Sequence, residues 1–128
     1  MRLGKIVRAG CAQGLSDAAV AAYDAPYPNS RYKVGARVFP TLVPIDPSNP
    51  AREANERAWE LFKNWHKPFI TLFSTRDPVT KGGQVMWQKK VPGAAGQNHT
   101  QIRGAAHFVQ EDKGEEVAQA LVAFIRAN

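Results

Sequence analysis

Two residues with acid–base chemistry follow two apolar stretches in the second half of the chain. Asp77 comes after the run Pro68–Ser74, and His107 follows a second run, Thr100–Gly104. Polar residues at the carboxyl ends of neighbouring parallel strands meet at one edge of a sheet. A carboxylate placed there orients an imidazole, which then acts as a general base. The pair therefore fits the acid and base of a catalytic triad, although a turn aspartate and a structural histidine are the plainer alternatives.

The elements that must position this pair follow from the hydrophobic pattern. Phe69–Ser74 is apolar at most positions, as expected for a strand covered on both faces. Asp77 precedes Pro78, which disfavours helical geometry and places the acid in an extended loop. A helix containing Val85 separates the strands. A closing helix carries Glu115 and Glu116 in its first turn, and it is predicted to bury Val117, Leu121, Phe124 and Ile125.

The second half thus reads α-β-α-β-α, and its two strands should be parallel because a helix connects them. A two-stranded parallel sheet has two unpaired edges and buries little apolar surface. We therefore expect this chain to share a larger sheet with another segment. In the first half, Ser16 is a favourable N-cap for a helix over Asp17–Tyr23, and Tyr32–Val43 is predicted to be helical with an interruption at Pro40.

The stretch Val43–Pro50 contains three prolines and is predicted to be irregular. Asn49 and Pro50 then favour the start of a helix that ends near His66. Its apolar stripe consists of Ala54, Ala58, Leu61 and Trp65, widened by Trp59 and Phe62.

Bulk composition limits the classes of function. The chain has 128 residues, 44% of them hydrophobic, and a formal net charge of +6. Its basic residues are scattered, so we expect no nucleic-acid partner. No window approaches the roughly 20 apolar residues that a membrane span needs, and the single Cys11 fits a reducing compartment. The sequence therefore predicts a cytoplasmic protein, with no membrane partner and no disulfide.

Three motifs carry a resemblance to a known family. FSTRDPVT, around Asp77, resembles the acid loop of the α/β-hydrolases, and GAAHFVQED, around His107, resembles their histidine loop. The stretch LSDAAVAAYDAPYPNSRYKVGARVFPTLVP is similar to the cap domain of haloalkane dehalogenases. The motifs occur in the family's order over nearly the whole chain. The resemblance implies a C-terminal portion of an α/β-hydrolase fold, with residues 1–48 from the helical cap and 49–128 from the core.

In that family an aspartate on a Gly-x-Asp-x-Gly-like elbow displaces the halide, and a water activated by the histidine hydrolyses the resulting ester. No such elbow occurs here, because Gly10 and Gly14 have the glycine spacing but enclose Ala12. The resemblance therefore implies Asp77 and His107 as catalytic residues, a small halogenated alkane as substrate of the complete enzyme, and no cofactor. It also implies that this chain alone is inactive and needs an N-terminal half.

The resemblance further implies a substrate pocket lined by Phe39, Pro40, Val43 and Val79, for which core packing is the alternative. Ala106 replaces the glycine usual before the histidine, so we expect its methyl group to crowd the loop. No metal site is predicted, since His66 and His99 lack ligand spacing with the nearby acids. Two other functions stay open: another α/β-hydrolase chemistry, such as epoxide or ester hydrolysis, and an interaction module that pairs through sheet edges with a partner or a second copy.

Overall fold

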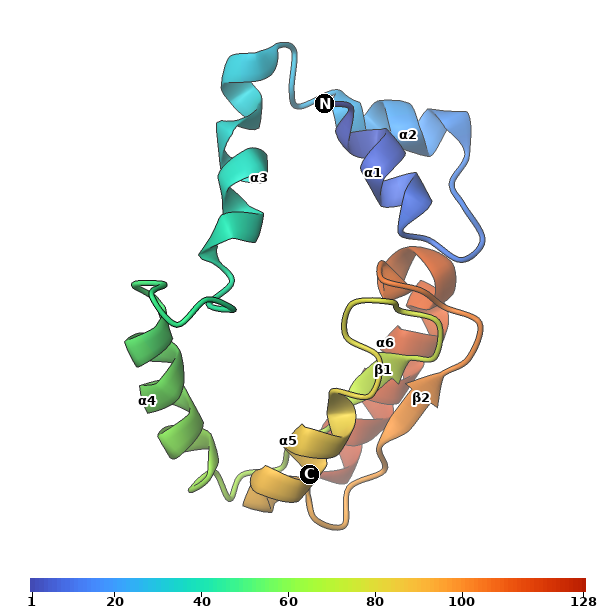
Figure 1. Ribbon diagram of the computed structural model, residues 1–128. Helices are drawn as coiled ribbons and strands as arrows, with labels where there is room; N and C mark the ends of the chain where they lie inside the picture. Colours follow the sequence, from blue (N-terminus) through green and yellow to red (C-terminus); the bar gives the residue numbers. More distant parts are fainter.

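A computed structural model describes all 128 residues and shows an α/β arrangement (Figure 1). The second half of the chain alternates helix and strand as predicted, and the first half is helical. The elements, in chain order, are α1 (Leu3–Ala9), α2 (Asp17–Asp24), η1 (Ser30–Lys33), α3 (Val34–Val38), η2 (Phe39–Leu42), α4 (Arg52–Phe62), β1 (Leu72–Ser74), α5 (Gln84–Lys90), η3 (Pro92–Ala94), β2 (Thr100–Ile102) and α6 (Val109–Ala127).

The sheet consists of two parallel strands in the register Leu72 to Thr100 and Ser74 to Ile102. This confirms the predicted strand direction. The first strand is shorter than the predicted Phe69–Ser74, because only its last three residues find a partner on β2. Leu72 and Phe73 are half-buried rather than buried, because the sheet has only two strands and the helix packed against both, α6, covers only part of its surface.

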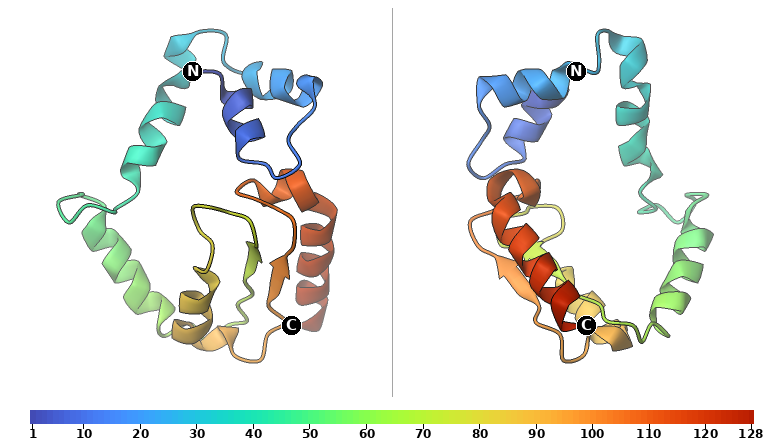
Figure 2. Two further views of the ribbon diagram at one scale, coloured as in Figure 1. Left: turned by 45° about the vertical axis from the view of Figure 1, so that its right-hand side comes forward. Right: turned by 180° about the vertical axis from the view of Figure 1, so that it is seen from behind.

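Helices α1 and α2 pack on each other and lie beside the start of α6, at the end of the sheet to which both strand arrows point (Figures 1 and 2). Ser16 caps α2 as predicted, accepting a hydrogen bond from the backbone N–H of Ala19 at 3.1 Å. The two helices approach closely at Gly4, where a Cβ atom would lie 2.1 Å from the carbonyl oxygen of Val20. Glycine is therefore required at this crossing.

Between α2 and β1 the chain follows a wide path away from the sheet through α3 and α4 (Figure 2). The segment Tyr32–Val43 is divided into η1, α3 and η2. Helix α4 begins at Arg52 and ends at Phe62, so both boundaries predicted for it were too wide. Asn49 does not cap the helix, because its side-chain oxygen accepts the N–H of Ala51 in the preceding turn at 2.9 Å.

An aromatic cluster joins α4 to α5 and to the residues before β1. The rings of Trp59 and Trp87 have centroids 4.4 Å apart, and Phe62 meets Trp87 edge to face at 5.2 Å. Phe69 stacks on Trp87, with ring centroids 5.6 Å apart. Trp59, which the sequence placed in the apolar stripe of α4, therefore packs on α5, and this cluster connects the long first half of the chain to the sheet.

Helix α6 packs against both strands, but its burial differs from the prediction. The backbone is non-helical at Lys113, which leaves a short first turn and a longer helix after it. The prediction that four residues of this helix are buried was wrong for this chain, because none of them is. Leu121 is exposed and Ile125 is 71% exposed, whereas Val117 and Phe124 are half-buried. The stripe has the expected period, but two strands do not present enough surface to cover it.

Candidate functional site

Asp77 and His107 meet at the carboxyl end of the sheet. The Nδ1 atom of His107 lies 3.1 Å from Oδ1 and 3.2 Å from Oδ2 of Asp77, although thirty positions separate the two residues. The acid is 3% exposed, whereas the histidine side chain is 40% exposed. One carboxylate thus holds the inner nitrogen of the imidazole, and the outer nitrogen, Nε2, is left for chemistry.

The loop after β1 is built to hold Asp77 as an anion. Its Oδ1 accepts the backbone N–H of Val79 at 2.8 Å, and its Oδ2 accepts the hydroxyl of Thr80. Burial raises the pKa of this carboxyl, but the hydrogen bonds from Thr80, Val79 and His107 outweigh burial and hold the pKa below its usual value. Pro78 follows the acid and keeps it in the extended loop that the sequence predicted.

The histidine loop is held against β1. The backbone N–H of Arg76 donates to the carbonyl of Ala105 at 3.0 Å, and the Ser74 hydroxyl donates to the carbonyl of Ala106 at 2.7 Å. The expectation that the methyl group of Ala106 crowds this loop stays a prediction. No residue other than glycine has a positive φ, so the backbone of Ala106 is not in the left-handed region, and the imidazole reaches Asp77 at 3.1 Å.

A shallow hollow of about 170 Å³ lies beside the pair. It is lined by Leu72, Phe73, Ser74, Asp77, Thr80, His107 and Val109. None of the four predicted substrate-binding residues lines it. Val79 adjoins the acid but is 71% exposed, and Phe39, Pro40 and Val43 lie at or next to η2, on the wide path away from the sheet (Figure 2). In this chain by itself, the structure does not bring these three residues to the pair.

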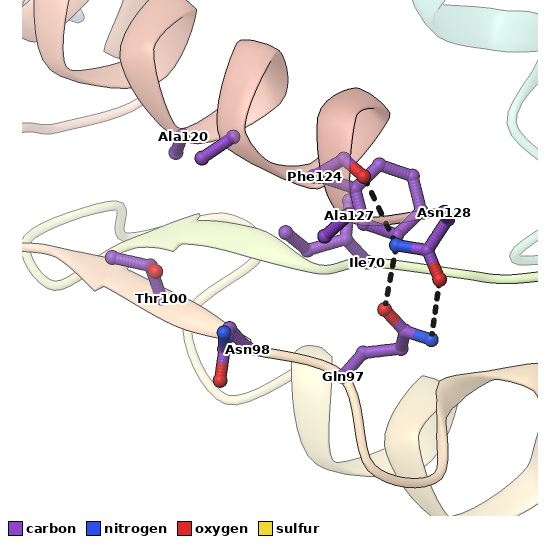
Figure 3. Close-up of a pocket in the computed structure, with 9 residues that line it drawn as sticks. Ile70, Gln97, Asn98, Thr100, Ala120, Phe124, Ala127 and Asn128 are labelled. Carbon is purple, nitrogen blue, oxygen red and sulfur yellow. Dashed lines mark hydrogen bonds between the residues drawn. The ribbon is translucent and has the colours of Figure 1, made fainter.

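A second hollow, of about 130 Å³, lies at the opposite end of the strands, between the end of α6 and the residues before β2 (Figure 3). Ile70 and Phe124 point into it, and the side-chain amides of Gln97 and Asn128 bond each other across its rim, with both distances 3.3 Å. None of the side chains that line it is an acid or a base. We interpret it as a gap in the packing between α6 and the sheet.

Sequence reasoning missed three residues around the pair. Thr80 bonds the acid, Ser74 bonds the loop before the histidine, and Asp112 accepts the backbone N–H of Ala106 at 2.8 Å. Hydroxyl and carboxyl groups close to a catalytic motif were the available signal. His99 is structural, because its ring bonds the backbone of Thr71 at 3.1 Å and the carbonyl of Ala94 at 2.9 Å. No group of three potential metal ligands occurs.

Comparison with known proteins shows which proteins this chain is similar to. The chain is 52% identical over 126 residues to a haloalkane dehalogenase of Psychrobacter cryohalolentis. The matched residues make up 98% of the chain and 42% of that relative. The chain is 44% identical to a haloalkane dehalogenase of Mycolicibacterium paratuberculosis and 45% identical to one of Mycobacterium marinum, over 97% and 94% of the chain. The chain is a relative of the haloalkane dehalogenases. It spans about two fifths of their length. No protein-family model matches it.

The match confirms the family resemblance inferred from the acid loop, the histidine loop and the cap-like stretch, and the chain corresponds to a C-terminal portion of the haloalkane dehalogenases. The helical first half followed by helices around parallel strands is compatible with such a portion of an α/β-hydrolase. None of the helices has the length and apolar character needed to cross a bilayer.

Proposed function

We propose that this chain supplies the acid and the base of a haloalkane dehalogenase, with Asp77 as the acid and His107 as the base. The observation that carries the proposal is the contact of 3.1 Å between the buried Asp77 carboxylate and Nδ1 of the half-exposed imidazole. The carboxylate holds Nδ1 as the protonated nitrogen and stabilises the imidazolium, so Nε2 accepts a proton from water.

The proposed reaction needs one group that these 128 residues do not contain. A carboxylate nucleophile, supplied by a segment equivalent to the N-terminal part of the relatives, attacks the halogen-bearing carbon and releases halide. Water then attacks the ester carbonyl while His107 takes the proton, and the alcohol leaves. Within this scheme, residues 1–48 belong to the cap and 49–128 to the core, and Phe39, Pro40, Val43 and Val79 come to the substrate when the cap closes over the core.

The exposed apolar residues support a partner segment as the complement of this chain. Leu121 and Ile125 on α6, Val85 and Met86 on α5, and both sheet edges are left uncovered. A dehalogenase N-terminal portion would add strands to the two-stranded sheet and cover such residues. Pairing of two copies through the same edges is the competing arrangement, and sedimentation of the purified chain with and without the N-terminal portion separates the two. We place the complex in the cytoplasm, where Cys11 stays reduced.

The test is complementation. The 128-residue chain is joined to the N-terminal portion of the Psychrobacter relative, and halide release from a brominated or chlorinated alkane is measured. We expect release that the His107→Ala and Asp77→Ala variants lose by at least a hundredfold. The positive control is the same N-terminal portion joined to its own C-terminal portion. A folded hybrid without halide release, beside an active control, would overturn the proposal. Hydrolysis of an epoxide or ester by that hybrid would instead favour the alternative chemistry.

A further inference from the structure

The backbone of Ala106, the residue directly before His107, is held from two directions. The carbonyl oxygen of Ala106 accepts a hydrogen bond from the hydroxyl of Ser74 at 2.7 Å, and the N–H of Ala106 donates to Oδ2 of Asp112 at 2.8 Å. Ser74 is the last residue of β1, three positions before Asp77, and Asp112 lies in the first turn of α6. Both backbone polar groups of the buried residue Ala106 are therefore occupied, which fixes the backbone from which the imidazole extends toward its acid.

The same carboxylate also binds the opposite end of the chain. Oδ2 of Asp112 accepts the N–H of Ala12 at 2.8 Å, and Oδ1 accepts the N–H of Gln13 at 2.9 Å. Ala12 and Gln13 lie in the turn between α1 and α2, about 100 positions before Asp112. Burial raises the pKa of the Asp112 carboxyl. This effect is outweighed by the hydrogen bonds from the N–H groups of Ala12, Ala106 and Gln13 and by the charge of Arg76, which hold the pKa below its usual value, so the group stays an anion.

Further contacts beside Asp112 make this junction specific. The N–H of Phe108 donates to the carbonyl of Gly10 at 3.2 Å, and a Cβ atom on Gly10 would come within 2.6 Å of the Phe108 ring. The ring of Phe108 in turn meets the imidazole of His107 edge to face, with centroids 5.1 Å apart. The hydroxyl of Tyr23 on α2 bonds the carboxylate of Glu111. The turn after α1 therefore contacts the histidine loop through its backbone, and α2 contacts the first turn of α6 through Tyr23.

We propose that Asp112 is a positioning residue for His107, and that through it the turn Gly10–Gln13 sets the orientation of the imidazole toward Asp77. This inference rests on the proposed role of His107 as the base. Asp112 touches no substrate and transfers no proton. It joins the turn between α1 and α2 to the loop that carries the histidine, so a displacement of α1 and α2 changes the contact between His107 and Asp77.

The test is proton and nitrogen NMR of the complete 128-residue chain, read at the Nδ1–H of His107. In Asp112→Asn, a side-chain N–H₂ replaces one oxygen and faces backbone donors. We expect the Nδ1–H to exchange with solvent about tenfold faster and its signal to move upfield, because the hydrogen bond to Asp77 lengthens. The matched control is Glu116→Gln, which removes one charge from the same helix at an exposed residue and should leave the signal unchanged. The amide of Thr71, bonded to His99, reports whether the sheet stays folded.

A second variant covers the case in which Asp112→Asn unfolds the chain and the Thr71 signal is lost. Gly10→Ala leaves the carboxylate intact and displaces the Phe108 ring, so it should move the His107 signal in the same direction. Unchanged His107 signals in whichever of these variants stays folded would overturn the inference. Failure of halide release in the hybrid, with the His107 signal intact and responsive to Asp112→Asn, would count against the dehalogenase proposal and not against this one.

Discussion

Replacing Asp77 by asparagine should cost about 2 kcal/mol of the free energy of unfolding at neutral pH. The carboxylate accepts three hydrogen bonds, from the N–H of Val79, the hydroxyl of Thr80 and Nδ1 of His107. Each bond to a charged group contributes about 1.5–3 kcal/mol. Asparagine keeps one acceptor oxygen and turns an N–H₂ group toward the other donors, so about one such bond is lost. Thr80 and His107 reach solvent, which limits the remaining loss.

The assay is urea unfolding of the 128-residue chain followed by circular dichroism. With a slope of about 2 kcal/mol per molar urea, the midpoint should fall by about 1 M. The control is Asp46→Asn, since Asp46 also accepts hydrogen bonds, from the N–H and hydroxyl of Ser48, but lies in an exposed turn. This control should change the free energy of unfolding by less than about 0.5 kcal/mol. Equal midpoints for the Asp77 and Asp46 variants would refute the view that the buried acid is held as an anion by its loop.

Three other outcomes are expected. The pKa values of Asp77 and Asp112 are lowered in the folded chain, so the stability that these two carboxylates contribute is complete above the ordinary aspartate pKa of about 3.9. This stability is lost as the pH falls through the lower pKa values of the folded chain. In an acid titration followed by circular dichroism, the Asp77→Asn variant should therefore lose less stability below pH 4 than the unchanged chain does. Ser16→Ala should cost about 1 kcal/mol in urea unfolding, and retention of the full midpoint would contradict its role as the cap of α2. Trp87→Ala should cost about 2–3 kcal/mol and abolish near-ultraviolet dichroism from the aromatic cluster, whereas an unchanged near-ultraviolet spectrum would show that the rings do not pack.

The sequence predicted the local elements best where the signal was short-range. Ser16 before Asp17–Asp24 is a capping pattern, and the structure has the helix and the cap hydrogen bond. The order of strands and helices in the second half was also predicted correctly, because hydrophobic period and proline positions act within one element. The predicted boundaries were wrong where a residue distant in the sequence decides them. Strand β1 contains only the residues that pair with β2, and α4 ends at Phe62, whose ring packs in the aromatic cluster.

By itself, the sequence determined which chemical groups are present and which motif each belongs to, and hence that Asp77 and His107 are an acid and a base after successive strands. Only the tertiary structure decided that they are 3.1 Å apart, that Ser74 supports the histidine loop, and that Asp112 ties this loop to the turn between α1 and α2. The physical reason is that hydrogen bonds between residues 30 to 100 positions apart leave no periodic trace in a single sequence. They depend on how the elements pack, and Asp112 looked like one more acid at the start of a helix.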